Sequence, residues 1–186
     1  MNTRPTFEDR IYERVVNQIH SWDTKQYPDI YALSFLYSTG FAEDIEGNDI
    51  CIEAGLSVSF NTLSHYQSQI EKASSAQEAK WNFAFWLQKP VIEMPQFLGG
   101  TVDPEDWEIY QAWIATQNVD DDEVSKTLVD CYAAIAKRLH DEGILTQTLC
   151  RNIPIIIHDL EYEELGDTAT RWANPKALLI EYLAEW

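Results

Sequence analysis

The stretch "IYALSFLY", residues 30–37, alternates between two sets of side chains, and both sets are mostly apolar. Because successive side chains of an extended chain point to opposite faces, each set would occupy one face of a strand. The two sets are Tyr31, Leu33, Phe35 and Tyr37, and Ile30, Ala32, Ser34 and Leu36. A strand that is apolar on both faces is typical of the interior of a sheet. We therefore predict a central strand here.

Two other stretches also have strand character. The stretch "ICIEAGLSVSFNT", residues 50–62, alternates again and carries Gly55 as a bulge or bend. Between the first two strands, "STGFAEDIEGND" is rich in turn-forming and acidic residues and predicts a loop. The first two strands are therefore expected to be antiparallel neighbours. The segment "NIPIIIHDLEYEE" contributes a third predicted strand over residues 153–159.

Helical spacing of apolar residues predicts two long helices. Thr6 is a suitable N-cap for the first, which has one apolar stripe. That stripe consists of Phe7, Ile11, Val15, Ile19 and Trp22. The second lies within residues 118–143, and Gly143 suits the position just after its end. Its apolar stripe consists of Val124, Leu128, Cys131, Ile135 and Leu139.

Start and stop signals predict three more helices. One follows Ser75 and runs to about Lys89, where Pro90 stops it. Asp103 and Asn174 are expected to cap the other two, because each is followed by a proline, which favours the first helical position.

The order of the predicted elements indicates the fold class. Strands do not alternate strictly with helices, so an α+β fold is favoured over a doubly wound α/β fold. We predict a single domain over residues 1–186, with an antiparallel or mixed sheet of at least three strands packed with about five helices.

The chain carries 31 acidic and 13 basic residues, a formal net charge of −18. Such a charge repels nucleic acid and anionic membrane surfaces, and it attracts basic proteins. The alternative explanation is that the acids only keep the protein soluble. The N-terminal residues have no apolar signal-peptide region, and the three widely spaced cysteines indicate reduced thiols. We therefore expect a cytoplasmic protein that crosses no membrane, and the sequence indicates no cofactor.

Two acidic motifs are candidates for chemistry. "DDDE", residues 120–123, lacks the alternating ligands and central glycine of a calcium loop, so acids favoured at a helix start are the preferred interpretation. His158 and Asp159 could bind a metal or act as an acid–base pair. No recognised metal-binding spacing supports that role, and an acidic loop after a strand is the preferred interpretation.

Acidic residues also form blocks, and residues 90–125 contain no lysine or arginine. A continuous negative face of this kind suits a basic protein partner. A solvated surface without a partner is the alternative. The candidate contact residues are Asp120, Asp121, Asp122, Glu161, Glu163 and Glu164.

The stretch "EAKWNFAFW", residues 78–86, places four large aromatic residues close together. On a helix, Phe83 and Trp86 would share one stripe, whereas Trp81 and Phe85 would point to roughly the opposite side. A helix that is apolar on two sides is normally buried between layers. If one side were open instead, Trp81 and Phe85 would be an aromatic anchor for a partner.

Four segments in order carry a family resemblance: "DIYALSFLYSTG", "SSAQEAKWNFAFW", and "NIPIIIHDLEYEE" followed by "RWANPKALLIEYL". Together they resemble the bacterial domain-of-unknown-function family numbered 4303, over nearly the whole chain. The resemblance implies one compact α+β domain without established catalytic residues. Families of this kind are often associated with polymorphic-toxin loci, where small acidic proteins serve as immunity proteins.

Three functional hypotheses follow. The leading one is a non-enzymatic protein-binding protein of the immunity type, which neutralises a basic toxin domain. The second is a small hydrolase or metal-dependent enzyme built around His158 and Asp159. The third is a scaffold homodimer that associates through Trp-rich helices. The sequence leaves the oligomeric state open.

Overall fold

The computed structural model describes residues 6–43, 49–87, 104–158 and 163–184. Its sheet has three strands in the order β2-β1-β3: β1 is Ile30–Glu43, β2 is Asp49–Thr62 and β3 is Ile155–His158. The β1 and β2 strands are antiparallel, whereas β3 runs parallel to β1. The predicted central strand, its antiparallel neighbour and the α+β class are confirmed. The sheet is mixed, one of the two arrangements expected.

The hairpin is longer than predicted. β1 continues to Glu43 and β2 begins at Asp49, so much of the expected loop belongs to the two strands. The two strands remain paired here as far as Glu43 and Asp49, and this pairing outweighs the local turn preference of residues such as Gly40. The irregularities in register lie between Ile30 and Ala32 and between Gly40 and Phe41. The bulge expected at Gly55 is therefore misplaced, because Gly55 pairs in regular register with Ser38.

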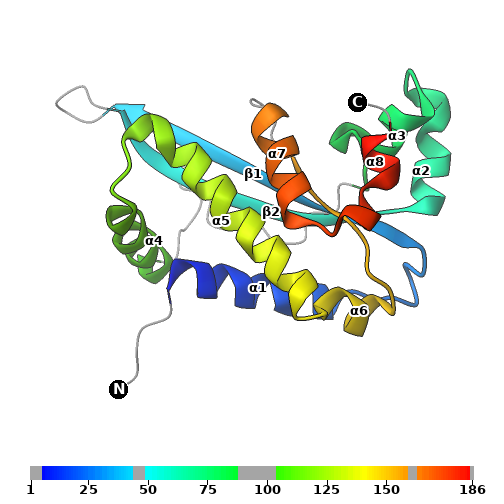
Figure 1. Cartoon of the computed structure of the whole chain (residues 1–186), viewed down its shortest axis with the longest axis horizontal. Helices are drawn as coiled ribbons and strands as arrows, with labels where there is room; N and C mark the ends of the chain where they lie inside the picture. The colour runs from blue at the N-terminus through cyan, green and yellow to red at the C-terminus, as the bar shows by residue number, and fades with distance from the viewer. Residues whose placement is uncertain (1–5, 44–48, 88–103, 159–162, 185–186) are drawn as a thin grey trace.

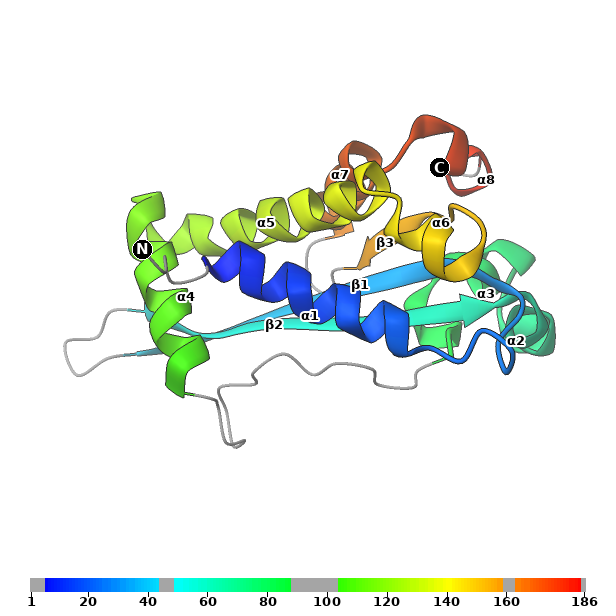
Figure 2. The ribbon, with the colours of Figure 1, turned by 90° about the horizontal axis from the view of Figure 1, so that it is seen from below.

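Helices lie on both faces of the sheet (Figures 1 and 2). The larger core joins one face to α1 (Phe7–Ser21), α4 (Pro104–Gln117), α5 (Asp121–Asp141) and α6 (Ile144–Leu149). A smaller core forms around Ala32 and Ile156 on the other face. This core receives Trp81 from α3 (Ala76–Trp81), Tyr182 from α8 (Ile180–Leu183) and Leu179, which directly precedes α8. α2 (Leu63–Gln69) follows β2, and α7 (Glu163–Ala173) packs on β3 and α5.

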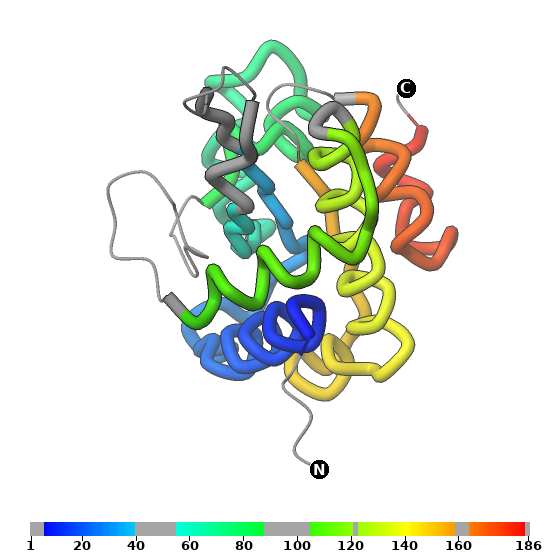
Figure 3. Tube along the Cα trace, turned by 90° about the vertical axis from the view of Figure 1, so that its left-hand side faces the viewer, coloured from blue at the N-terminus to red at the C-terminus, as the bar shows by residue number. Residues whose placement is uncertain are grey.

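The helical stripes predicted for α1 and α5 are buried as expected. Every member of both stripes lies in the larger core. Gly143 has the left-handed conformation, with φ of 69°, that a residue just beyond a helix end commonly adopts. The view in Figure 3 shows α1 and α5 side by side at this core. The cap expected at Asp103 lies outside the described residues, although α4 does begin at Pro104.

Replacing Thr6 with alanine is expected to destabilise the fold by about 1 kcal/mol. The backbone N–H of Asp9 donates to Thr6 Oγ1 at 3.2 Å, so the substitution removes the acceptor for a helix-terminal donor. Chemical denaturation monitored by circular dichroism measures the change. Thr6→Ser keeps the hydroxyl and should retain most of the stability. Equal losses in the two variants would show that the cap is not the cause.

Two predicted helices are wrong in extent. The helix after Ser75 ends at Trp81, because Asn82 adopts an extended conformation and its Oδ1 accepts from the N–H of Ala84 at 2.9 Å. A 3₁₀ turn, Phe83–Phe85, follows. Asn174 does not cap the last helix, because its side chain is bonded to β3 instead. That region forms a 3₁₀ turn followed by the short α8.

Candidate functional site

His158 ends β3 and has hydrogen bonds at both ring nitrogens. Its Nδ1 lies 2.7 Å from the hydroxyl of Ser34 on β1, and its Nε2 lies 3.2 Å from the carbonyl oxygen of Trp81. A carbonyl oxygen only accepts, so Nε2 carries a proton and donates it. In the neutral ring, Nδ1 therefore accepts from the Ser34 hydroxyl. The imidazole thus connects β1, β3 and the end of α3.

Burial holds His158 in its neutral form. It lowers the pKa of the imidazole to about 4, although the hydrogen bond to Trp81 opposes this shift. Phe83 and Trp86 pack against the ring, with centroid distances of 5.3 and 5.1 Å. At neutral pH the ring is an uncharged component of the smaller aromatic core.

The pairing of Ser34 with His158 has the elements of a nucleophile and its base, but Ser34 is fully buried. A catalytic nucleophile must contact the substrate as well as its base. The hydroxyl of Ser34 is buried within the protein, so a substrate has no access to it. Asp159, the other residue of that hypothesis, lies outside the described residues. In the part of the chain that the structure describes, no group of three or more His, Cys, Asp or Glu side chains is placed to hold a metal.

Cys131 behaves as a core residue. It is buried on the apolar stripe of α5, and burial raises the pKa of its thiol. Cys150 is exposed, and both of these thiols are free. His140 is placed between Asn152 and Asn174, with ring nitrogens 2.8 and 3.0 Å from their side-chain oxygens.

The aromatic run is divided between two short elements. Trp81 is 9% exposed and packs edge-on against Tyr31 and Tyr182, with centroids 5.6 and 5.5 Å away. Burial, one of the two outcomes set out above, therefore applies to Trp81. Phe85 is partly buried on the 3₁₀ turn. The helical-angle argument fails here because Asn82 interrupts the helix, so Trp81 and Trp86 enter the same core.

The acidic candidates lie at the starts of two helices. Asp120 is the N-cap residue of α5, where its carbonyl accepts from the N–H of Glu123, but its side chain makes no capping hydrogen bond. Glu164 is exposed in the first turn of α7. Both helices begin along the upper edge of the molecule in Figure 1. Glu161 and the side chains of Asp121, Asp122 and Glu163 lie outside the described structure.

A pocket with a cavity volume of about 560 Å³ lies between α5 and α7. Its buried apolar residues are Val129, Ala133 and Ala169. Leu165, Thr168 and Trp172 line it from α7, and Lys126, Asp130 and Glu164 add charged groups. This is the size of cavity that commonly receives a ligand or a large side chain.

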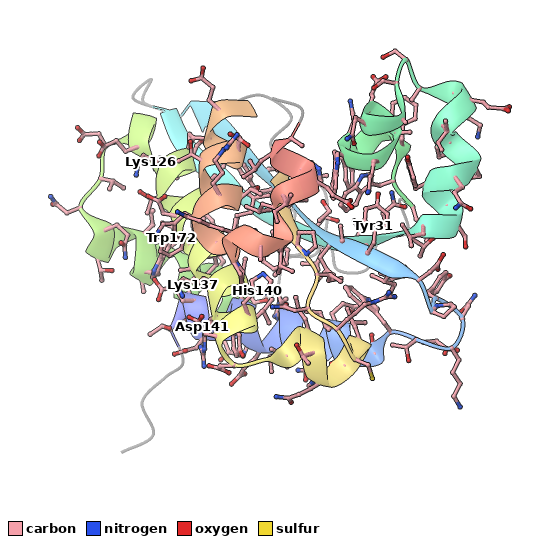
Figure 4. All side chains as sticks on the ribbon, turned by 45° about the vertical axis from the view of Figure 1, so that its right-hand side comes forward. Tyr31, Lys126, Lys137, His140, Asp141 and Trp172 are labelled. Atoms are coloured by element: carbon pink, nitrogen blue, oxygen red, sulfur yellow. The ribbon has the colours of Figure 1, made fainter. Side chains whose placement is uncertain are left out.

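Trp172 is the residue of this pocket that sequence analysis missed. It is 57% exposed, whereas its neighbour Ala173 is buried. Figure 4 shows Trp172 on α7 and Lys126 on α5, both of which line the pocket. Trp172 lies seven residues after Leu165 and three after Ala169, a spacing typical of a buried stripe. Periodicity alone therefore assigns it to the core.

Comparison of the chain with family models, with curated proteins and with solved structures finds no match. The resemblance described above therefore stays a hypothesis. No helix among the described residues is long and apolar enough to span a lipid bilayer.

Proposed function

We propose that this chain is a non-enzymatic protein-binding protein of the immunity type, which acts in the cytoplasm by neutralising a basic toxin domain. The observation that carries the proposal is an apolar pocket with an exposed tryptophan, whose lining includes Asp130 of α5 and Glu164 at the acidic start of α7. An interface commonly combines an apolar, aromatic centre with a charged rim. The arrangement therefore supports protein recognition.

The charge distribution supports a basic partner. Basic side chains are used within the molecule: Arg10 and Arg14 pair with the buried Asp106, and Arg138 pairs with Glu142 at 2.7 Å. Even if every one of the 13 basic residues paired with one acid, 18 acids would remain. Complementary charge increases the rate of encounter with a basic protein, and it selects against acidic competitors.

A pull-down from the source organism tests this function. At about 0.05 M salt the tagged protein should retain a basic protein, and at about 0.5 M salt less should be retained, because salt screens exposed charges. Mass spectrometry identifies the retained protein. A variant with Asp120→Asn, Glu123→Gln and Glu164→Gln removes three negative charges and should retain less of the basic protein at low salt. If no basic protein is retained at low salt, the proposed function is wrong.

A further inference from the structure

We propose that the α5–α7 pocket is a docking site for a basic segment of the partner, which inserts one large apolar side chain against Trp172. This inference rests on the proposed function, because it takes the partner to be a basic protein. It adds the surface, the anchoring residue and the chemistry of the segment that binds there.

The hollow exists because α7 approaches its neighbours through small residues. The buried residues of this helix include Gly166, Ala169, Thr170 and Ala173, and their short side chains allow close packing against β3 and α5. The larger side chains of Leu165 and Trp172 flank this contact, leaving the cavity of about 560 Å³ above Ala133 and Ala169. The close packing of α7 against β3 and α5 therefore also produces the apolar pocket, which is open to the surface.

Trp172 supplies the aromatic contact. A tryptophan that is 57% exposed beside an apolar cavity leaves a large apolar area in water, and covering that area is favourable. Tryptophan is enriched among the residues that dominate binding energy at interfaces. An inserted leucine- or phenylalanine-sized side chain would cover the ring of Trp172 and the apolar residues of the pocket together.

The charge around the pocket selects a basic segment. By sequence, residues 120–133 and 163–173 contain eight acids and two bases, a net charge of −6. Both bases are already paired, Lys126 with Asp130 at 2.6 Å and Arg171 with Asp167 at 2.7 Å. The Lys126–Asp130 pair is well exposed on both sides, so opening it requires little free energy. A lysine or arginine of the partner can therefore replace Lys126 beside Asp130, or approach Glu164.

Peptide binding to the whole chain tests the docking site. The probe is an 18-residue helical peptide of leucine and lysine with its leucines on one face, and the matched probe has alanine in place of leucine. Fluorescence anisotropy at about 0.15 M salt measures both affinities. We expect the leucine peptide to bind the wild type about tenfold more tightly than the alanine peptide. Trp172→Ala should remove about that factor for the leucine peptide.

Three variants make the test specific. Ile180→Ala removes a side chain that is 67% exposed on α8 and outside the pocket, so it should leave peptide affinity unchanged. On the rim, Glu164→Gln should weaken binding, and Lys126→Gln should strengthen it, each by about threefold or less. Circular dichroism confirms that the exposed substitutions leave the fold intact.

Several outcomes would overturn the docking site. One is unchanged affinity in Trp172→Ala, and another is an equal loss in Ile180→Ala. If the two peptides bind equally and only the charge variants weaken binding, the docking site is wrong while the proposed attraction of basic partners stands. If neither peptide binds at about 0.05 M salt, both proposals are contradicted. Preferential binding of a small apolar probe such as benzene, with no binding of the leucine peptide, also overturns the docking site.

Discussion

Replacing Asn174 with alanine is expected to lower the free energy of unfolding by about 3–5 kcal/mol. The side chain of this buried residue connects β3, α7 and, through His140, α5. Its Oδ1 accepts from the N–H of Ile155 at 2.8 Å, and its Nδ2 donates to the carbonyl oxygens of Ile155 and Thr170 at 2.7 and 2.8 Å. The substitution leaves the buried N–H and C=O of Ile155 without these partners, at about 1–3 kcal/mol each.

The reason for this sensitivity is that α7 covers the outer edge of β3. Thr170 Oγ1 accepts from the N–H of Ile157 at 2.9 Å, just as Asn174 bonds to Ile155. Four residues along a helix advance about 6 Å, and two residues along a strand advance about 6.6 Å. The two side chains are thus spaced to bind alternate backbone groups of the strand. In this way the helix caps a strand edge that would otherwise expose unpaired donors and acceptors.

Urea denaturation monitored by circular dichroism measures the loss, with the slope compared between variants to confirm that the same transition is observed. Asn152→Ala is the matched control, because it removes an exposed asparagine that also contacts His140 but has no bond to Ile155. We expect it to change stability by less than about 0.5 kcal/mol. A loss below about 1 kcal/mol for Asn174→Ala would contradict the proposed role in covering β3.

Acidification is expected to destabilise the protein by up to about 3 kcal/mol between pH 6.5 and pH 4, through His158. In the unfolded chain the imidazole has its ordinary pKa of 6.5, whereas in the fold burial lowers its pKa to about 4. In this pH range the unfolded state therefore binds more protons. The stability contributed by the neutral ring is complete above pH 6.5 and is lost as the pH falls towards 4.

The pH dependence of the free energy of unfolding tests this expectation. His158→Asn removes the titrating ring and keeps a side-chain oxygen that can accept from Ser34, so the slope between pH 6.5 and 4 should become shallower. Some slope should remain, because burial also lowers the pKa of His140. The pKa of the Asp29 carboxyl is lowered mainly by its hydrogen bond from the Ser64 hydroxyl. Protonation of Asp29 therefore destabilises the fold only at still lower pH. An unchanged slope in His158→Asn would contradict the role of His158.

Periodicity identified the parts of this fold whose local pattern agrees with their final environment. Residues 30–37 are apolar on both faces because helices cover both faces of β1, and the stripes of α1 and α5 are buried without exception. Hydrophobic burial acts on each of these elements in the same way whichever neighbour covers it. The positions of these elements in the sequence could therefore be predicted without knowing which elements pack together.

Side-chain hydrogen bonds explain two places where the helix start and stop signals in the sequence predict the wrong helix extent. Asn82 and Asn174 are both suitable helix caps by residue type, but only Asn174, which precedes a proline, is predicted to cap a helix. Asn82 does cap, but it caps the 3₁₀ turn and thereby ends α3 at Trp81. Asn174 instead bonds to a strand 19 residues earlier. An asparagine can bond equally well to its own helix or to a distant strand, and only the packed chain determines which partner is within reach.

Patterns in the sequence were sufficient to predict the α+β class, the central strand, the two long helices and the large acid excess. The strands and helices follow from the spacing of apolar residues along short segments, and the acid excess follows from a count of charges, so neither depends on how the elements pack. The packed chain was needed to show that Trp81 is buried while Trp172 is exposed, that both nitrogens of His158 have hydrogen bonds, and that α5 and α7 enclose a pocket. Side-chain exposure and cavity shape depend on how closely two elements approach each other. For α7 that distance is set by small residues at its contact with β3 and α5, and helical spacing does not encode it.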